Sequence, residues 1–281
     1  MTTPPNRQFV RNEDIERYYD TQQIFYTLFW SRTALHYGLW YENTKSLTEA
    51  VLNTNKFIVE ALNIGADDRV LDAGCGVGGT SIYVAEATGA TVDGITLSTR
   101  QVRIAKRRAA KSSASRSLNF SRENFTRTRF KEETFSKLFG VESVCYAHRK
   151  SDFLREAHRV MKPRGVVAII DLFLAKSELD QEEMEIYHKT IEGWAIPQFS
   201  TVPDFCDHLA EAGFGNIRFQ ELHSEIRNSS RRMYFQKLLW APFDFVASRI
   251  GDGSQNLSAK YQKAFFDRGI GTYGAFVATK L

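Results

Sequence analysis

The chain has 281 residues, and its 43% hydrophobic and 25% charged content excludes a disordered or fibrous protein. A formal charge of +4 at pH 7 is too small to indicate nucleic-acid binding by itself. The best apolar run, residues 166–175, is short and contains Asp171, so we expect no transmembrane segment; the N-terminus also lacks the apolar stretch of a secretory signal. Cys75, Cys145 and Cys206 are widely spaced and odd in number, which favours thiols in a reducing cytoplasm.

The first part of the chain, residues 12–62, is predicted to be helical because aromatic side chains recur at helical spacing. After Gly65 the character changes, and regular elements are predicted in the order strand 69–74, helix 80–87 and strand 91–96. A basic amphipathic helix comes next, with an inner face formed by Val102, Ala105 and Ala109.

The alternation continues to the C-terminus. Further strands are predicted at residues 118–121, 137–142, 165–174, 216–222 and 272–279. Between them, one helix is expected to start with Ser151 as its N-cap and to stop before Pro163, and another to run from Thr201 to Gly213.

Strands that alternate with helices predict an α/β protein with a mostly parallel sheet covered by helices on both faces. We expect residues 1–62 to form an N-terminal helical cap segment and residues 63–281 to form the main domain. The segments near 175–200 and 223–265 are longer than ordinary connections and are predicted to be helical cap insertions.

A glycine-rich stretch, VLDAGCGVGG at residues 70–79, lies between a predicted strand and a predicted helix. Gly74, Gly76 and Gly79 have the spacing of a dinucleotide-binding loop, so a nicotinamide cofactor must be weighed. The negative charge of Asp72 would repel a pyrophosphate but attract a sulfonium or ammonium group. The second strand also ends without the acidic residue that binds an NAD ribose, so both features argue against a nicotinamide cofactor.

Residues 71–79 resemble motif I of the class I S-adenosylmethionine-dependent methyltransferases. Three further segments resemble sterol, tocopherol or cyclopropane-forming members of that class: GITLSTRQ at 94–101, GVESVCYA at 140–147 and FLREAHRVMKP at 153–163. Four ordered motifs are more specific than one glycine loop. The resemblance implies a Rossmann-like, seven-stranded sheet and S-adenosylmethionine as the cofactor.

The resemblance also implies a cofactor site, residue by residue. Asp72, Gly74 and Gly76 are expected at the methionine end, and Thr96, Leu97 and Gln101 at the ribose. Asn124 and Phe125 are expected at the adenine, although many relatives have Asp where Asn124 stands. A second departure is Arg164, which occupies a turn position where glycine is usual.

The aromatic excess indicates the acceptor side of the site. YYD at 18–20 and HYGLW at 36–40 resemble segments that lie over the cofactor in sterol and cyclopropane-forming enzymes. The residues expected to line the substrate pocket are Tyr18, Tyr37, Trp40, Cys145 and Trp194. An aromatic stripe at helical spacing is also compatible with ordinary core packing.

Four residues are candidates for catalysis: Glu142, Tyr146, His148 and Tyr19. Glu142 is the last residue of the fourth predicted strand, where it is a candidate proton acceptor or cation stabiliser, with a structural carboxylate as the alternative. Tyr146 and His148 follow in the same loop and are candidates for a base or relay, whereas Cys145 has no partner base beside it in sequence.

A basic stripe on the predicted helix after the second strand consists of Arg100, Arg103, Arg107 and Lys111. A solvated outer face is the favoured interpretation, which leaves peripheral membrane contact or a diphosphate-bearing substrate as alternatives. No metal-ligand spacing and no RNA-binding module is recognisable, so we expect neither a metal nor a nucleic-acid partner.

Together these features predict a cytoplasmic methyltransferase of isoprenoid or secondary metabolism that acts on a hydrophobic small molecule. The expected reaction transfers the methyl group to an alkene carbon of an isoprenoid or sterol-like acceptor through a carbocation. The alternative is O- or N-methylation of an aromatic secondary metabolite. A cofactor-binding partner subunit without catalysis and a homo-oligomer remain open.

Overall fold

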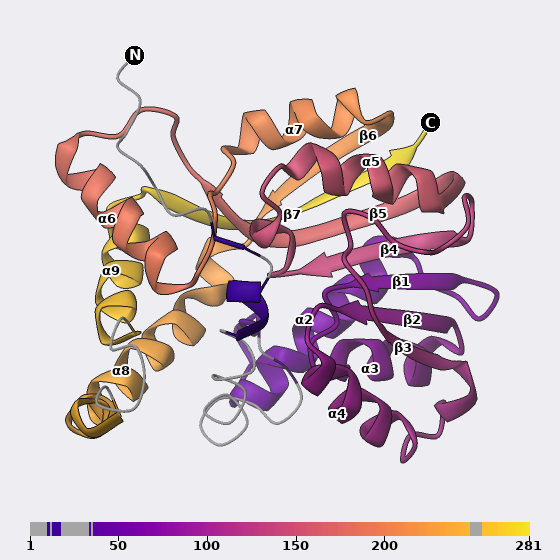
Figure 1. The fold of residues 1–281 in the computed structure, drawn as a ribbon, viewed down its shortest axis with the longest axis horizontal. Helices are drawn as coiled ribbons and strands as arrows, with labels where there is room; N and C mark the ends of the chain where they lie inside the picture. Colours follow the sequence, from indigo (N-terminus) through magenta and orange to yellow (C-terminus); the bar gives the residue numbers. More distant parts are fainter. Residues whose placement is uncertain (1–9, 12, 18–33, 35, 248–254) are drawn as a thin grey trace.

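The computed structural model describes residues 10–11, 13–17, 34, 36–247 and 255–281; for residues 236–247 and 255–260 only the backbone is described. Seven strands form one sheet in the order β3-β2-β1-β4-β5-β7-β6 (Figure 1). The strands are β1 Arg69–Ala73, β2 Thr91–Thr96, β3 Leu118–Arg122, β4 Phe135–Val141, β5 Met161–Leu174, β6 Phe214–Glu221 and β7 Gly271–Lys280. Strand β7 runs antiparallel to both of its neighbours, and the remaining pairs are parallel. The predicted α/β class with a mostly parallel sheet is confirmed.

Helices cover both faces of the sheet (Figure 1). They are α2 Leu47–Leu62, α3 Gly79–Thr88, α4 Thr99–Ala109, α5 Lys150–Val160, α6 Gln181–Gly193, α7 Val202–Glu211, α8 His223–Ala247 and α9 Gln255–Asp267. Successive residues of a strand point to opposite faces, so Val70 packs into the cluster that contains α2, α3 and α4, whereas Leu71 packs with α5 and α7. Two separate cores therefore hold the sheet between its helical layers.

The helices α6, α8 and α9 form a group of their own at one end of the sheet (Figure 1). Helix α9 packs against both α6 and α8. All three fall in the segments near 175–200 and 223–265 that were predicted to be helical. Among the described residues, no helix is long and apolar enough to cross a membrane.

The predicted helix over residues 12–62 is only partly present. A short helical stretch covers residues 13–17 and α2 covers the end, but residues 36–46 are turns and irregular backbone. The backbone amides of this segment are used elsewhere, because Leu39 donates to the carbonyl of Ala50 and Trp40 donates to that of Glu225. These bonds to distant segments replace the internal ladder of a helix.

Two local expectations around α5 differ from the structure. Helix α5 begins at Lys150 with Arg149 as N-cap, so the predicted N-cap Ser151 lies inside the first turn. The helix ends at Val160, before Pro163 as predicted, but β5 begins directly at Met161 and not at residue 165. Arg164 has a φ of 62°, a left-handed conformation that explains why glycine is usual at this position.

Candidate active site

A cavity of about 240 Å³ lies at the carboxyl ends of β1, β2 and β4, the edge where open parallel sheets bind ligands. It is lined by many of the residues that the sequence predicted for a site. These are Tyr37, Asp72, Gly74, Gly76, Thr96, Leu97, Gln101, Asn124, Phe125, Glu142, Cys145, Tyr146, His148 and Trp194.

The glycine loop has the backbone conformation that its sequence requires. Gly74, Gly76 and Gly78 have φ values of 107°, 51° and 79°, which side chains other than glycine rarely adopt. A Cβ on Gly74 would lie 2.3 Å from the Cβ of Ser143, so the loop after β1 and the loop after β4 touch at this point. Two walls of the cavity are thus held in direct contact.

Asp72 lines the cavity beside this loop, and its side chain is almost fully buried. Its Oδ2 accepts a hydrogen bond of 2.5 Å from the Ser81 hydroxyl on α3. Burial raises the pKa of Asp72 to about 7, against which the Ser81 hydrogen bond acts. A cationic ligand in the cavity would favour the carboxylate form, since an opposite charge lowers a carboxyl pKa.

The two polar residues expected at the ribose are bonded to each other. The Thr96 hydroxyl at the end of β2 donates to Gln101 Oε1 across 2.7 Å, and Gln101 is buried in the first turn of α4. Ser98 caps this helix by accepting from the Gln101 backbone amide. This arrangement holds the turn after β2 against the cavity.

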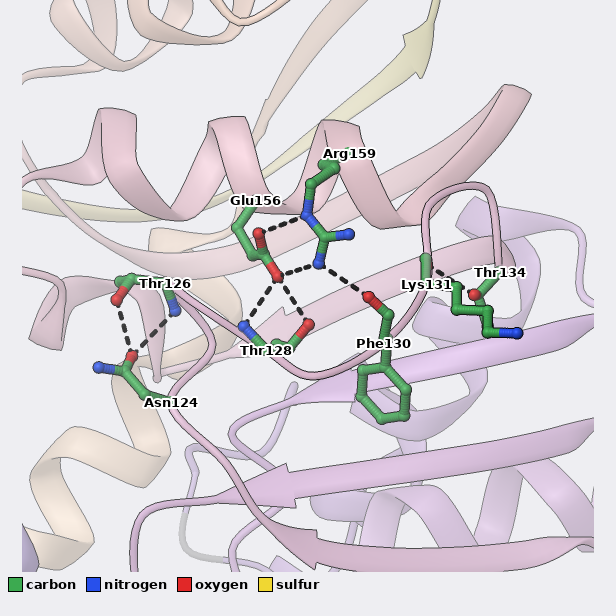
Figure 2. A network of polar contacts seen from close by, with 8 residues as sticks. All are labelled: Asn124, Thr126, Thr128, Phe130, Lys131, Thr134, Glu156 and Arg159. Atoms are coloured by element: carbon green, nitrogen blue, oxygen red, sulfur yellow. Dashed lines mark hydrogen bonds and ion pairs between the residues drawn. The ribbon is translucent and has the colours of Figure 1, made fainter.

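The loop after β3 is tied down by a network of polar contacts (Figure 2). Asn124 Oδ1 accepts from both the backbone amide and the hydroxyl of Thr126, at 2.9 and 2.8 Å. Glu156 on α5 accepts from Thr128 and pairs with Arg159. The side-chain oxygen of Asn124 is therefore bonded within its own loop, while Asn124 and Phe125 both line the cavity.

Glu142 lies directly after β4 in a left-handed conformation with a φ of 48°. One carboxylate oxygen, Oε1, accepts from the Tyr37 backbone amide at 2.7 Å and from the Tyr273 hydroxyl at 2.9 Å. Burial raises the pKa of Glu142 to about 8, partly opposed by these two hydrogen bonds. Glu142 also lines the cavity, so a carboxyl group with a near-neutral pKa faces the candidate reaction space.

Aromatic side chains come to the cavity from four different segments: Tyr37, Phe125, Tyr146 and Trp194. The Tyr37 ring meets the Tyr273 ring edge-on with centroids 5.9 Å apart.

Cys145 is buried in the wall, and burial raises the pKa of its thiol well above the ordinary value, so it is a wall residue and a poor nucleophile at neutral pH.

Three predicted pocket or catalytic residues are not placed in the cavity. Trp40 does not line it, because its indole N–H donates to the buried Ser229 hydroxyl on α8, across 2.9 Å. Tyr18 and Tyr19 lie outside the described residues.

Several cavity residues were not predicted. His36 is buried, donates from Nδ1 to its neighbour's carbonyl oxygen at 2.7 Å, and has its Nε2 3.3 Å from the Thr80 hydroxyl. Burial lowers the pKa of His36, which favours its neutral form. His36 belongs to the HYGLW segment, whose resemblance already indicated a position near the cofactor. For Met233, nothing in the sequence of α8 indicated that its side chain would reach the same cavity.

The residues present fit the cofactor that the resemblance implies. Two carboxyl groups, the buried Asp72 and the partly buried Glu142, face the cavity and suit a ligand with a sulfonium and an ammonium charge. Glycine backbone at Gly74 and Gly76 leaves room for close approach, and Phe125 offers a ring face for a base. Among the described residues, no group of three or more His, Cys, Asp or Glu side chains is arranged to hold a metal ion.

Comparison with known proteins gives consistent relatives. Methyltransferase GfsG from Streptomyces halstedii is 28% identical over 95% of this chain and 94% of its own. A sterol 24-C-methyltransferase from Eremothecium gossypii is 28% identical over 72% of this chain. The chain spans 54% of the length of that sterol enzyme, about half of it.

Solved structures share the fold. The [4+2]-cyclase SpnF superposes with a TM-score of 0.80 at 20% identity, covering 96% of both chains. Geranyl diphosphate C-methyltransferase from Streptomyces coelicolor A3(2) superposes with a TM-score of 0.76 at 18% identity, covering 99% of this chain and 100% of its own.

This fold with its glycine-loop cavity defines an S-adenosylmethionine-dependent methyltransferase of the Rossmann-like type. Within that class, the chain belongs to the mycolic acid cyclopropane synthetase family, which matches residues 7–231.

Proposed function

We propose that this enzyme methylates a hydrophobic small molecule at an alkene carbon of an isoprenoid or sterol-like acceptor. The observation that carries the proposal is Glu142, a partly buried carboxyl group in an aromatic-lined cavity beside the glycine loop. Relatives support the acceptor class, since the names of several are sterol 24-C-methyltransferase.

S-adenosylmethionine, when bound, supplies an electrophilic methyl group on a positively charged sulfur. Asp72 and the backbone of the glycine loop bind and orient the charged end of the cofactor. Phe125 and the turn at Thr96–Gln101 bind the nucleoside part. The N-terminal residues Ile15 and Glu16 line the cavity, which supports residues 1–62 as a cap segment whose role is to exclude water.

The π electron pair of the alkene would form the new carbon–carbon bond to the methyl carbon while the sulfur–methyl bond breaks. Its electron pair would stay on the sulfur of the departing S-adenosylhomocysteine, and the positive charge would pass to the neighbouring alkene carbon. Glu142 as a carboxylate, together with the faces of Tyr37 and Trp194, stabilises that charge. The carbon next to the cation then loses a proton, and the free Glu142 oxygen is the base that we assign to accept it, with Tyr146 and His148 as candidate relays.

A second candidate is methylation of an oxygen or nitrogen, in which Glu142 or His148 would take the proton of the acceptor group. Two relatives favour it: (+)-O-methylkolavelool synthase from Herpetosiphon aurantiacus, 26% identical over 77% of this chain, and 27-O-demethylrifamycin SV methyltransferase from Amycolatopsis mediterranei, 28% identical over 64%. This chemistry needs the same cavity but no stabilised cation.

The test uses cofactor labelled with ¹³C in its methyl group and three acceptor probes: a sterol with a side-chain double bond, geranyl diphosphate and an aromatic phenol. NMR of the product locates the label on carbon or on a heteroatom. Label on an alkene-derived carbon supports the proposal, and label on oxygen or nitrogen replaces it with the second candidate. Cofactor binding is measured separately by calorimetry, and absence of binding would overturn both.

The three cysteines of the chain are free thiols, and two of them are buried. Free thiols at these positions support the proposed cytoplasmic location, where disulfides are rare.

A further inference from the structure

Lys150, the first residue of α5, is buried although it carries a charged ammonium group. Its Nζ donates three hydrogen bonds to backbone carbonyl oxygens: Cys145 at 2.8 Å, Ala147 at 2.7 Å and Gln198 at 2.9 Å. An ammonium group has three donors, so all of them are used. Burial lowers the pKa of Lys150 to about 8.

The three carbonyls belong to two separate parts of the chain. Cys145 and Ala147 lie in the loop after β4, which contributes Glu142 and Tyr146 to the cavity. Gln198 lies in the link between α6 and α7, which contributes Trp194 and Ile196. One side chain therefore cross-links two walls on the same side of the cavity.

The loop is held from its other side by Asp171, a fully buried residue of β5. Asp171 Oδ2 accepts from the Cys145 backbone amide at 2.8 Å, so the residue Cys145 has its amide bonded to a buried anion and its carbonyl bonded to a buried cation. Attraction between Lys150 and Asp171 favours the charged form of both. A buried charge without such partners would be strongly unfavourable.

The position of Lys150 conflicts with the local preference of the helix. The N-terminus of a helix carries partial positive charge, so a lysine at the first position and an arginine at the N-cap are electrostatically unfavourable. Asp152 offsets the arginine through an ion pair of 2.9 Å with Arg149. In the part of the chain that the structure describes, Lys150 has no such ion pair at the helix terminus, and its hydrogen bonds go to the cavity wall. A residue that is unfavourable for its own helix but bonded to a site is expected where the site determines the residue type.

We propose that Lys150 is a positioning residue for the methyl acceptor, which holds the loop 142–148 and the link 194–200 in one arrangement. In this arrangement Glu142 and Trp194 face the same space, so losing the cross-link separates the base from the acceptor wall. The inference rests on the proposed function, since it assigns these two walls to the acceptor. None of the three hydrogen bonds of Lys150 goes to the glycine loop or to the turn after β2, so we expect cofactor binding to change little when Lys150 is replaced.

The test is hydrogen–deuterium exchange of the full chain for Lys150→Met, with Lys150→Arg as the conservative variant. A matched control is Lys280→Met, because Lys280 is also buried and its Nζ donates to two carbonyls, of His158 and Met161, at the opposite end of α5. We expect Lys150→Met to raise exchange by tenfold or more in both 143–149 and 194–200, Lys150→Arg to restore protection in part, and Lys280→Met to leave both segments unchanged. S-adenosylhomocysteine affinity should stay within twofold in Lys150→Met.

Increased exchange in only one of the two segments, in neither, or equally in both after Lys280→Met would overturn the inference. If Lys150→Met does not fold, native-state exchange of the wild-type protein at low urea replaces it: the two segments must open together with one urea dependence, and separate opening overturns the cross-link. Absence of S-adenosylhomocysteine binding by the wild-type protein is a different result, which overturns the proposed function and leaves the exchange data to decide the cross-link.

Discussion

Tyr273 donates its hydroxyl hydrogen to Glu142 Oε1 across 2.9 Å and so joins the antiparallel strand β7 to the loop after β4. Tyr273 is fully buried, and Glu142 lies 131 positions earlier in the chain. The Tyr37 backbone amide bonds to the same oxygen at 2.7 Å, so one carboxylate oxygen is fixed by two donors. The carboxyl group is thereby held in one orientation toward the cavity.

Replacing Glu142 with Gln should lower turnover roughly 10²–10⁴-fold, the range typical of a lost general base or charge stabiliser. Gln keeps the shape of the side chain and an oxygen that accepts from Tyr37 and Tyr273, so the fold and cofactor affinity should change little. Labelled-methyl transfer and calorimetry with S-adenosylhomocysteine measure the two quantities. Tyr273→Phe serves as the control, since it removes one donor but leaves the carboxylate, and we expect a smaller loss. Full turnover in Glu142→Gln would restrict this residue to a structural role.

Stability without ligand should fall as pH rises through neutrality. The pKa of Glu142 is raised from 4.5 to about 8 in the folded protein, so the unfolded chain loses this proton first as pH increases. The folded state then holds more protons than the unfolded state between about pH 4.5 and 8, and its stability decreases over that window. Urea unfolding at pH 5 and pH 8 measures the change. Glu142→Gln should reduce the slope without abolishing it, because the amide does not titrate whereas Asp72, with its pKa raised to about 7, still does. An equal slope in both proteins would argue against the raised pKa of Glu142.

The turn at Arg164 should be stabilised by glycine. Arg164 has a φ of 62°, and a side chain in that conformation costs roughly 1 kcal/mol relative to glycine. We expect Arg164→Gly to raise the free energy of unfolding by about that amount, measured by urea denaturation. Arg164→Ala is the matched control, because it also removes the guanidinium group but keeps the Cβ. A gain that is equal in both variants would assign the effect to the lost charge.

The ion pair between Glu16 and Arg122 should contribute to cofactor retention. Arg122 Nη2 lies 2.9 Å from the Glu16 carboxylate in the N-terminal helical stretch, and Arg122 Nε donates to the carbonyl of Leu97 in the cavity wall at 2.8 Å. Arg122 is mostly exposed, so the pair contributes only about 1 kcal/mol or less. Glu16→Gln should weaken S-adenosylhomocysteine binding up to about fivefold at low salt and less at high salt, measured by calorimetry. The exposed neighbour Glu13, changed to Gln, should have no such effect.

Much of the fold followed from local signals. The β-branched run in β5 and the glycine cluster after β1 were recognisable because burial of strands and tight turns impose residue types within a few positions. The α5 boundary was misplaced, since Ser151 has the better local preference for an N-cap, whereas Lys150 is bonded to carbonyls that include Gln198, 48 positions away. The HYGLW segment was expected to be helical because of the local spacing of its aromatic residues, but its backbone amides bond to carbonyls of α2 and α8.

The sequence by itself determined the α/β class, the position of the glycine loop and many of the side chains that surround the cavity, because these depend on spacing and residue type along short segments. Only the tertiary structure decided that Trp40 turns away to Ser229, that Met233 enters from α8, and that Lys150 and Asp171 hold opposite sides of one loop. Such contacts join residues that are far apart in the chain, and their free energy depends on burial and hydrogen-bond geometry that exist only once the sheet and its helices have packed together.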